Sequence, residues 1–265
     1  MRTALITGGS SGIGYAMSKR FARDGYRLLW VALDEQELIK SKAALQTEID
    51  HAQVEFMAID LSEPESAQSV YDWSAQHGWA VDVLVNNAGF GTYGYVSDIP
   101  VEREEAMIHT NVLATYRLTR LFLDDMLKRD AGTIIQIASN SAFQPVARMN
   151  TYAATKAFVH QFGRALQEEL ELKKSRVKCI TVCPAAIKDT AFRTAGHMDD
   201  AKTFNGLAAT TADEVADDVW RGFVRGSTFI VTGARMRFLH GIRRLVPYVL
   251  QQWMVRRETA RANDN

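Results

Sequence analysis

Two side chains that could together transfer a proton, Tyr152 and Lys156, stand four residues apart in the segment NTYAATKAF. Residues i and i+4 of a helix lie on one face, so the ammonium group can flank the phenol. An isolated tyrosine, with a pKa of about 10, is a poor base at neutral pH, but a cation held beside it favours the phenolate and lowers that pKa. On this spacing alone, an ordinary Tyr–Lys pair on one helix face is the simpler interpretation.

A glycine-rich segment, TGGSSGIG, joins the first apolar run of the chain to the first segment with helical periodicity. Gly8, Gly12 and Gly14 would let the backbone turn sharply and approach a pyrophosphate. The N-terminus of the following helix would then offer N–H groups and a positive dipole end to the phosphates. A glycine motif can also be only a tight turn, but its position in the first strand–helix unit indicates dinucleotide binding.

Short apolar runs alternate with longer amphipathic segments along the chain. The runs predicted as strands are TALIT, RLLWVAL, VEFMAI, VDVLVN, GTIIQIA, VKCITVC and STFIVT. The segments predicted as helices lie near residues 12–24, 34–50, 63–77, 101–129, 150–174 and 212–225. This alternation, with β-branched strands, predicts an α/β fold: a Rossmann-like, doubly wound parallel sheet of about seven strands with helices on both faces, in a single domain.

Two segments depart from the alternation. Residues 185–210 follow the sixth run with weak periodicity, at the end of the sheet where such folds bind ligands, and are expected to form a substrate loop. We expect residues 1–234 to form the dinucleotide-binding and catalytic domain, and residues 235–265 to form a basic amphipathic C-terminal extension.

Net charge, cysteine spacing and the lengths of the apolar runs argue against nucleic-acid binding, a disulfide framework, a metal site and a membrane-spanning protein. The formal net charge of zero provides no overall field that would attract nucleic acid. Cys179 and Cys183 lie on one predicted strand, roughly 13 Å apart at 3.3 Å per residue, which is too far for a disulfide. No His or acid cluster accompanies them, so we expect buried thiols and no metal site. A strand begins at once and no apolar run could span a bilayer, so we expect a cytoplasmic protein.

Further motifs fall in a consistent order along the chain. They are NNAG at residues 86–89, Asp60 in IDLS, Asn111 in HTNV, Ser139 in IASNS, and YAATK with Tyr152 and Lys156. With the glycine segment, they resemble the short-chain dehydrogenase/reductase (SDR) family over residues 1–192. The match is to its compact single-domain branch and to NAD(P)-dependent ketone and 3-oxoacyl reductases. In combination with Ser139 and the glycine segment, Tyr152 and Lys156 are interpreted as catalytic.

The resemblance implies a role for each of four side chains. Tyr152 would give a proton to the carbonyl oxygen during reduction and take it back during oxidation, while Lys156 would lower the Tyr152 pKa and hold the nicotinamide ribose. Ser139 would hydrogen-bond the carbonyl oxygen, and Asn111 would hold a water that links Lys156 to solvent. Ser141 competes for the serine role if the strand continues that far, but the thirteen-residue separation from Tyr152 favours Ser139.

The cofactor implied by the resemblance is NAD or NADP. The residues expected to bind it are Gly8, Ser10, Ser11, Gly12, Ile13, Gly14, Leu33, Asp60, Leu61, Asn87, Ala88, Gly89, Tyr152, Lys156, Pro184, Ile187 and Thr190. The family commonly has Pro-Gly with a threonine five residues after the proline, whereas this chain has Pro184-Ala185 and Asp189 there. Thr190 would take the place of that threonine if the turn absorbs one residue.

The choice between NAD and NADP stays open at the sequence level. The position that often carries an acid in NAD enzymes is Ala32, and the positions that often carry a base in NADP enzymes are Leu33 and Ser11. Asp34 would repel a 2′-phosphate if it pointed inward, because that group carries close to two negative charges. The resemblance to NADP-using ketone reductases with alanine at the same place favours the opposite choice.

Three loops are expected to enclose a small-molecule carbonyl or alcohol. Ser141, Phe143, Tyr93 and Phe192 are the residues expected at the substrate, and the further apolar residues are Phe90, Pro145, Met149, Met198 and Phe204. Together they indicate a fairly hydrophobic ketone or secondary alcohol. Arg148 or His197 could meet a polar head group.

The C-terminal segment, residues 235–261, holds seven arginines and one glutamate among apolar residues at roughly helical spacing, with Pro247 expected to kink the helix. It could pack on the domain or on another subunit, or lie as an amphipathic helix on an anionic membrane. We expect a homodimer or homotetramer. Two other functions stay open: a membrane-associated reductase of a lipid pathway, and a non-catalytic dinucleotide-binding sensor or scaffold, which would usually lack the tyrosine or the lysine.

Overall fold

The computed structural model describes residues 1–188, 209–242 and 245–259. In these ranges, parallel strands form a seven-stranded sheet in the order β3-β2-β1-β4-β5-β6-β7. The strands are β1 (Thr3–Thr7), β2 (Arg27–Ala32), β3 (Val54–Ala58), β4 (Val83–Asn86), β5 (Thr133–Ile137), β6 (Lys178–Cys183) and β7 (Phe229–Val231). The predicted Rossmann-like fold is confirmed, and the strand order reverses between β1 and β4, where folds of this type bind their ligands.

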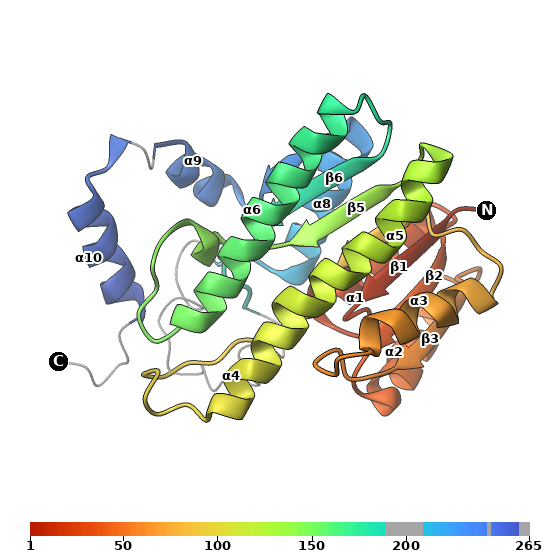
Figure 1. Ribbon diagram of the computed structural model, residues 1–265, viewed down its shortest axis with the longest axis horizontal. Coiled ribbons are helices and arrows are strands. Elements are labelled where there is room, and N and C mark those ends of the chain that lie inside the picture. The colour runs from red at the N-terminus through yellow and green to blue at the C-terminus, as the bar shows by residue number, and fades with distance from the viewer. Residues whose placement is uncertain (189–208, 243–244, 260–265) are drawn as a thin grey trace.

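Helices cover both faces of the sheet (Figure 1). One face carries α1 (Gly12–Arg23), α2 (Glu35–Glu48) and α8 (Ala212–Arg225). The other carries α3 (Ser66–Gln76), α5 (Thr115–Arg129) and α6 (Asn150–Leu172). The helix predicted over 101–129 consists of α4 (Val101–Ile108) and α5, joined by the π-helical segment η1 (His109–Ala114). Because π-helical turns occur often at functional sites, η1 is a first structural sign of where the site lies.

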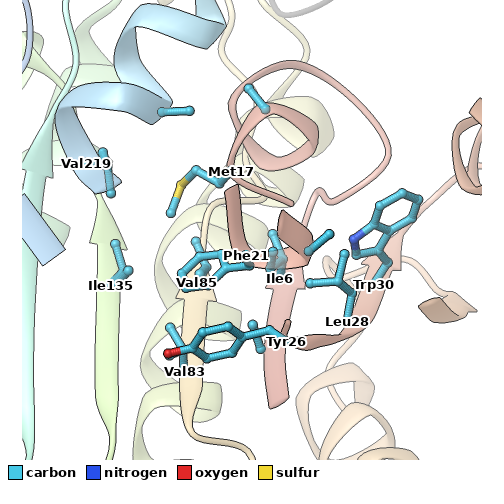
Figure 2. Packing of buried hydrophobic residues seen from close by; sticks show 14 of the residues in the cluster. Ile6, Met17, Phe21, Tyr26, Leu28, Trp30, Val83, Val85, Ile135 and Val219 are labelled. Atoms are coloured by element: carbon cyan, nitrogen blue, oxygen red, sulfur yellow. The ribbon is translucent and has the colours of Figure 1, made fainter. Parts of the chain in front are cut away.

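A cluster of buried apolar side chains holds α1 and α8 against the sheet (Figure 2). Met17 and Phe21 of α1 lie over Val85 and Ile6 of the neighbouring central strands. Val219 of α8 lies beside Ile135 of β5. The ring of Phe21 meets the rings of three aromatic neighbours edge to face, at centroid distances of 5.1, 5.3 and 5.6 Å; these are Tyr26, Trp220 and Phe223. This contact fixes α1, and therefore the glycine turn that begins it.

The two cysteines are free and buried, as the sequence predicts. Cys179 and Cys183 both lie on β6, in the central layer of the fold. Burial in apolar surroundings raises the pKa of each thiol to about 12. Neither thiol is therefore ionised at neutral pH, and both act as small core residues.

The C-terminal segment forms α9 (Ala234–Ile242) and α10 (Tyr248–Thr259), which lie at one side of the molecule (Figure 1). The backbone helix is interrupted before Pro247, in agreement with the predicted kink. His240 of α9 packs its ring on Phe143 at 4.5 Å, and Val255 of α10 packs beside the buried residues around Tyr152. None of the described helices is both long and apolar enough to cross a membrane.

The packing of Phe21 leads to a test of the fold. Phe21 is 1% exposed, so Phe21→Ala should lower the free energy of unfolding by about 3–5 kcal/mol, as expected for removing a buried aromatic ring. Leu172→Ala is the control, because Leu172 is 84% exposed at the end of α6, and it should change stability by less than about 0.5 kcal/mol. Urea unfolding monitored by circular dichroism measures both values, and equal losses would contradict this packing.

Candidate active site

The glycine turn between β1 and α1 has the geometry of a phosphate cradle. Gly8 and Gly12 have φ angles of 64° and 51°, a region that favours glycine. A Cβ on Gly14 would lie 2.0 Å from the Gly8 carbonyl oxygen, so the turn can close only with glycine there. Helix α1 follows with Ser11 as its N-cap and no side-chain capping bond. Its first N–H groups and its positive dipole end are therefore available to an anion, and the residues fit a dinucleotide pyrophosphate.

Thr7 and Asn87 attach the glycine turn to the segment after β4. The Thr7 hydroxyl oxygen accepts hydrogen bonds from the backbone N–H groups of Asn87 and Ala88 at 3.0 and 2.9 Å. The Asn87 side-chain amide donates to the carbonyl oxygens of Thr7 and Gly8 at 2.9 and 3.2 Å. These bonds bring Asn87 and Ala88 to the glycine turn, at the reversal of the strand order where the sequence analysis expects the cofactor.

Asn86 has a different position from Asn87, because it points into the sheet. Its amide donates to the Thr119 hydroxyl at 2.9 Å and to the Gln136 side-chain oxygen at 3.2 Å. Gln136 in turn donates to Thr119 at 2.8 Å. The three residues are buried and connect β4, β5 and α5. Asn86 thus stabilises the end of the sheet, while Asn87 reaches the ligand side.

Tyr152 lies near the start of α6, 8% exposed, and its side chain is hydrogen-bonded to Ser139. Ser139 follows β5 and also accepts a hydrogen bond from the backbone N–H of Ser141 at 3.1 Å. Burial raises the pKa of Tyr152 to about 12, and the bond to Ser139 acts in the opposite direction. The direction of this shift is the reverse of the lowering expected from the Tyr–Lys spacing, because desolvation disfavours the phenolate.

Lys156 follows one helical turn after Tyr152 and is also buried, with its Nζ 5.9 Å from the centre of the Tyr152 ring. Nζ donates to the carbonyl oxygen of Ile137 at 2.9 Å. Burial lowers the pKa of Lys156 to about 8. The side chain is therefore mostly charged at pH 7 but loses its proton at a lower pH than an exposed lysine does. Among the described residues Nζ has one hydrogen-bond acceptor, and an ammonium group has three N–H bonds, so two are available to sugar hydroxyls.

Asn111 is 1% exposed within the π-helical segment η1. Its amide donates to the Phe90 carbonyl at 2.9 Å and to the Thr155 hydroxyl at 3.1 Å, and its Oδ1 accepts from the Phe90 N–H at 3.1 Å. A Cβ on Gly89 would lie 2.7 Å from Asn111 Oδ1 and 3.4 Å from Lys156 Nζ. Asn111 and Lys156 are therefore neighbours across Gly89. A second lone pair on Oδ1 is what the predicted relay water would use.

The two serines after β5 occupy different positions. The strand ends at Ile137 and does not continue to Ser141, which lies in the 3₁₀ turn η2 (Asn140–Phe143). Ser141 therefore does not share a strand face with Ser139, and the condition for its competing role is not met. Ser141 Oγ is buried and has no hydrogen-bond partner among the described residues. Ser139 is the serine that contacts Tyr152, which is the arrangement that the thirteen-residue spacing favours.

Apolar side chains surround Tyr152. Buried or partly buried members of this group are Phe90, Tyr93, Met107, Val146, Met149, Ala153, Ala186 and Val255. Arg148 joins segments 90–98 and 141–150, two of the loops expected to enclose the substrate, because its guanidinium donates to the Tyr95 hydroxyl at 3.0 Å and the Tyr93 hydroxyl at 3.5 Å. Phe143 instead packs beside Ala138, Val159, Cys183 and Val231. Its ring therefore contributes to the attachment of α9.

The other predicted cofactor residues have varied surroundings. Asp60 is exposed and accepts from the Ser62 N–H at 2.8 Å, and Leu61 is buried with the residues of α3 and α5. Leu33 is 70% exposed. The remaining placements are Ser10, 4% exposed in the glycine turn, and Ile13, partly buried beside the core.

The segment after β6 is described only as far as residue 188. The Pro184 carbonyl accepts from the Asn140 N–H at 2.9 Å, and Ile187 is a buried residue paired in a parallel bridge with Thr210. The predicted residues that lie outside the described residues are Asp189, Thr190, Phe192, His197, Met198 and Phe204.

Sequence reasoning missed three side chains that support this arrangement. Thr7 holds the segment after β4, and Thr155 fixes the amide of Asn111. Thr155 directly precedes Lys156 in the YAATK segment. Its position beside a catalytic candidate is a sequence signal for a supporting role. Val255 gave no such signal, because only the folding of the C-terminal segment back on the domain brings it to the Tyr152 surroundings.

Comparison with known proteins agrees with this geometry. An Escherichia coli relative, an NADP-dependent 3-hydroxy acid dehydrogenase, is 31% identical over 221 residues, which are 82% of this chain and 86% of the relative. A short-chain dehydrogenase from Sphingobium yanoikuyae, solved in complex with NADPH, has a TM-score of 0.79 and 30% identity, with coverage of 100% of this chain and 99% of that chain. A bulky-bulky ketone specific alcohol dehydrogenase from Comamonas testosteroni has a TM-score of 0.75 and 26% identity, with coverage of 100% and 97%.

The family model for short chain dehydrogenases matches residues 2–200, which is more than half of the chain. This match covers the glycine turn, the segment after β4 and the Ser139, Tyr152 and Lys156 positions. The two solved structures match the fold over the full length of this chain. The chain belongs to the short-chain dehydrogenase family and is an oxidoreductase that uses NAD or NADP.

Proposed function

We propose that the protein interconverts a ketone and a secondary alcohol on a hydrophobic small molecule, with Tyr152 as the general acid and base. The observation that carries this proposal is the contact of Tyr152 with Ser139 beside the buried Lys156. The nicotinamide dinucleotide, when bound, supplies or accepts a hydride. The residues of the chain then have to position the carbonyl and to move one proton at its oxygen.

Ser139 and Tyr152 would act on the same carbonyl oxygen. A hydroxyl from each would donate a hydrogen bond to it and stabilise the negative charge that develops there. With a pKa raised to about 12, Tyr152 is protonated at neutral pH, which is the form that donates a proton in the reductive direction. In the oxidative direction, Tyr152 would first have to lose this proton.

Lys156 would act by holding rather than by reacting. Nζ lies beside Gly89, across from Asn111, and hydroxyl oxygens of a ribose would be suitable acceptors for its remaining N–H bonds. A bound ribose would replace part of the hydration that Lys156 loses on burial, and would therefore favour its charged form. In that form, Lys156 lowers the pKa of the neighbouring phenol by direct electrostatic attraction.

The apolar surroundings of Tyr152 support a hydrophobic substrate. Tyr93 and Met149 are each 7% exposed beside Tyr152, and a charged substrate would meet few groups able to solvate it there. The Comamonas testosteroni neighbour, which is named for bulky-bulky ketones, is consistent with a ketone that carries an apolar group on both sides.

A second candidate, a reductase that works at a membrane surface, is favoured by one observation. Large apolar side chains on α9, α10 and the turn between them are at least 47% exposed: Phe238, Leu239, Leu245, Val249, Leu250 and Trp253. Exposed arginines accompany them, at 235, 256 and 257. This combination is typical of segments that lie on anionic membranes, although the same side chains could pack on a second copy of the chain.

Removal of the Tyr152 hydroxyl tests the proposed mechanism. Tyr152→Phe should lower kcat for ketone reduction by about 10²–10⁴-fold, the usual contribution of general acid catalysis. The dissociation constant of the reduced dinucleotide, measured by fluorescence, should change by less than about threefold, since the phenyl ring still fills its place. Tyr116→Phe, on the partly exposed Tyr116 of α5, is the control and should retain activity. Unchanged turnover in the Tyr152 variant would refute the mechanism.

Burial of Lys156 predicts a stability that depends on pH. Its pKa is 10.5 in the unfolded chain and about 8 in the folded protein, so between these values the unfolded state binds more protons and stability rises with pH. Lys156→Met removes this dependence. The free energy of unfolding of the variant, relative to the parent, should fall by roughly 2 kcal/mol from pH 7 to pH 10.

Urea unfolding at the two pH values measures this difference. Lys40→Met is the matched control, because Lys40 is exposed on α2 and its replacement should change stability by less than about 0.5 kcal/mol at either pH. An equal difference between the Lys156 variant and the parent at pH 7 and pH 10 would show that Lys156 is not buried as described.

The membrane candidate predicts binding to vesicles. The parent protein should float with vesicles that contain anionic lipid and should not float with zwitterionic vesicles. Replacement of both Val249 and Trp253 by glutamate should abolish this flotation, whereas Leu172→Glu, on the exposed Leu172 far from α10, should not. Loss of a dimer in the double variant, without any vesicle binding by the parent, would instead assign these side chains to a subunit contact.

A further inference from the structure

The start of α2 contains an acidic group in contact with the glycine turn. The Ser10 hydroxyl donates a hydrogen bond to Glu37 Oε2 at 2.7 Å. Ser10 is 4% exposed in the turn, and Glu37 is half-buried in the first turn of α2. The carboxylate of Glu37 is thus held at the turn that is built for the pyrophosphate.

The contact between Ser10 and Glu37 lies in the region where folds of this type bind the ribose of the adenosine half of the cofactor. The Gly8 N–H donates to the Val31 carbonyl at 2.7 Å, so the glycine turn leaves the sheet directly beside the end of β2. In folds of this type, the acid that binds the ribose 2′-hydroxyl lies about 20 residues beyond the glycine motif, in this same region. Ala32, at the end of β2, has no group that could bind a hydroxyl, but Glu37 places a carboxylate close by.

The side chains next to Glu37 are not placed to bind a ribose hydroxyl. Leu33 is apolar and 70% exposed. Asp34 is engaged as the N-cap of α2, where its Oδ1 accepts from the Glu37 N–H at 3.0 Å. Only one oxygen of Glu37 has a hydrogen-bond donor among the described residues, and a carboxylate can accept several hydrogen bonds. Oε1 therefore remains able to accept one from a sugar hydroxyl.

The charge around this contact is negative. Between Arg27 and Lys40 the sequence contains Asp34, Glu35 and Glu37 and no basic residue. The positive end of the α2 dipole, which would attract a phosphate, already faces these three carboxylates. In the sequence only Asp34 stands out as a charge that could repel a 2′-phosphate, because the contact of Glu37 with the glycine turn arises from the fold.

We propose that Glu37 reads the adenosine ribose and makes the enzyme prefer NAD to NADP. This inference rests on the proposed dinucleotide-dependent function. Glu37 Oε1 would accept a hydrogen bond from the ribose 2′-hydroxyl, and Ser10 would position the carboxylate through Oε2. NADP carries a phosphate at this place, with close to two negative charges, so the same carboxylate would repel it.

Titration of the fluorescence of NADH and NADPH with the purified full-length protein tests the proposal without a substrate. The parent should bind NADH more tightly than NADPH by about tenfold or more, as expected from charges a few ångströms apart in a partly solvated site. Glu37→Gln keeps the shape and removes the charge. It should weaken NADH binding, tighten NADPH binding and reduce the ratio of the two dissociation constants by roughly fivefold or more.

Glu35→Gln is the matched control, because it removes the same charge from the same turn of α2 at an exposed residue that does not contact the glycine turn. Its ratio should stay within about twofold of the parent ratio, since an exposed charge is screened by salt. Equal effects of the two substitutions would show that general charge, rather than Glu37, sets the preference. They would overturn the assignment of Glu37.

Two further outcomes separate this inference from the proposed function. Tighter binding of NADPH than of NADH by the parent would overturn the inference and leave the proposed function intact. Binding of neither dinucleotide would overturn the proposed function itself, and the inference with it. Circular dichroism of each variant establishes that a change in the ratio does not arise from unfolding.

Discussion

The burial of the Lys156 ammonium beneath the end of β5 is the constraint on which the site depends. Nζ has the Ile137 carbonyl as its acceptor at 2.9 Å, and burial lowers its pKa to about 8. A cation in such surroundings is unfavourable unless polar groups face it. Its surroundings accordingly include the Ile137 carbonyl oxygen and the Asn111 side chain, which Nζ can approach only because Gly89 between them lacks a side chain.

Hydrogen bonds of polar side chains hold the carboxyl end of the sheet together. Asn86, Thr119 and Gln136 form one group inside the sheet, and Thr7 connects the glycine turn to the segment after β4. The first group ties α5 to β4 and β5, and the Thr7 bonds hold the backbone that follows β4. The apolar clusters on the two faces of the sheet stabilise the fold as a whole, whereas these bonds determine the positions of a few atoms at its edge.

Much of the fold could be predicted from the sequence, because strand and helix periodicities alternate from Thr3 onward with few exceptions. Ser139 and Tyr152 could be placed together, since one follows a parallel strand and the other begins the next helix. The π-helical segment around Asn111 could not be predicted, because a helical period continues through it. The lysine four residues away predicts a lowered pKa for Tyr152, whereas burial of the phenol raises this pKa.

Selectivity depends on contacts that sequence spacing does not reveal. Glu37 reaches Ser10 only because α2 begins directly after β2 and turns its first residues toward the glycine turn. Val255 reaches the Tyr152 surroundings only because α10 returns to the domain after the interruption at Pro247. The reacting groups lie within one sheet edge and α6, where the backbone fixes their spacing. Glu37 and Val255 instead come from elements toward the two ends of the chain, so either contact can change without moving the reacting groups.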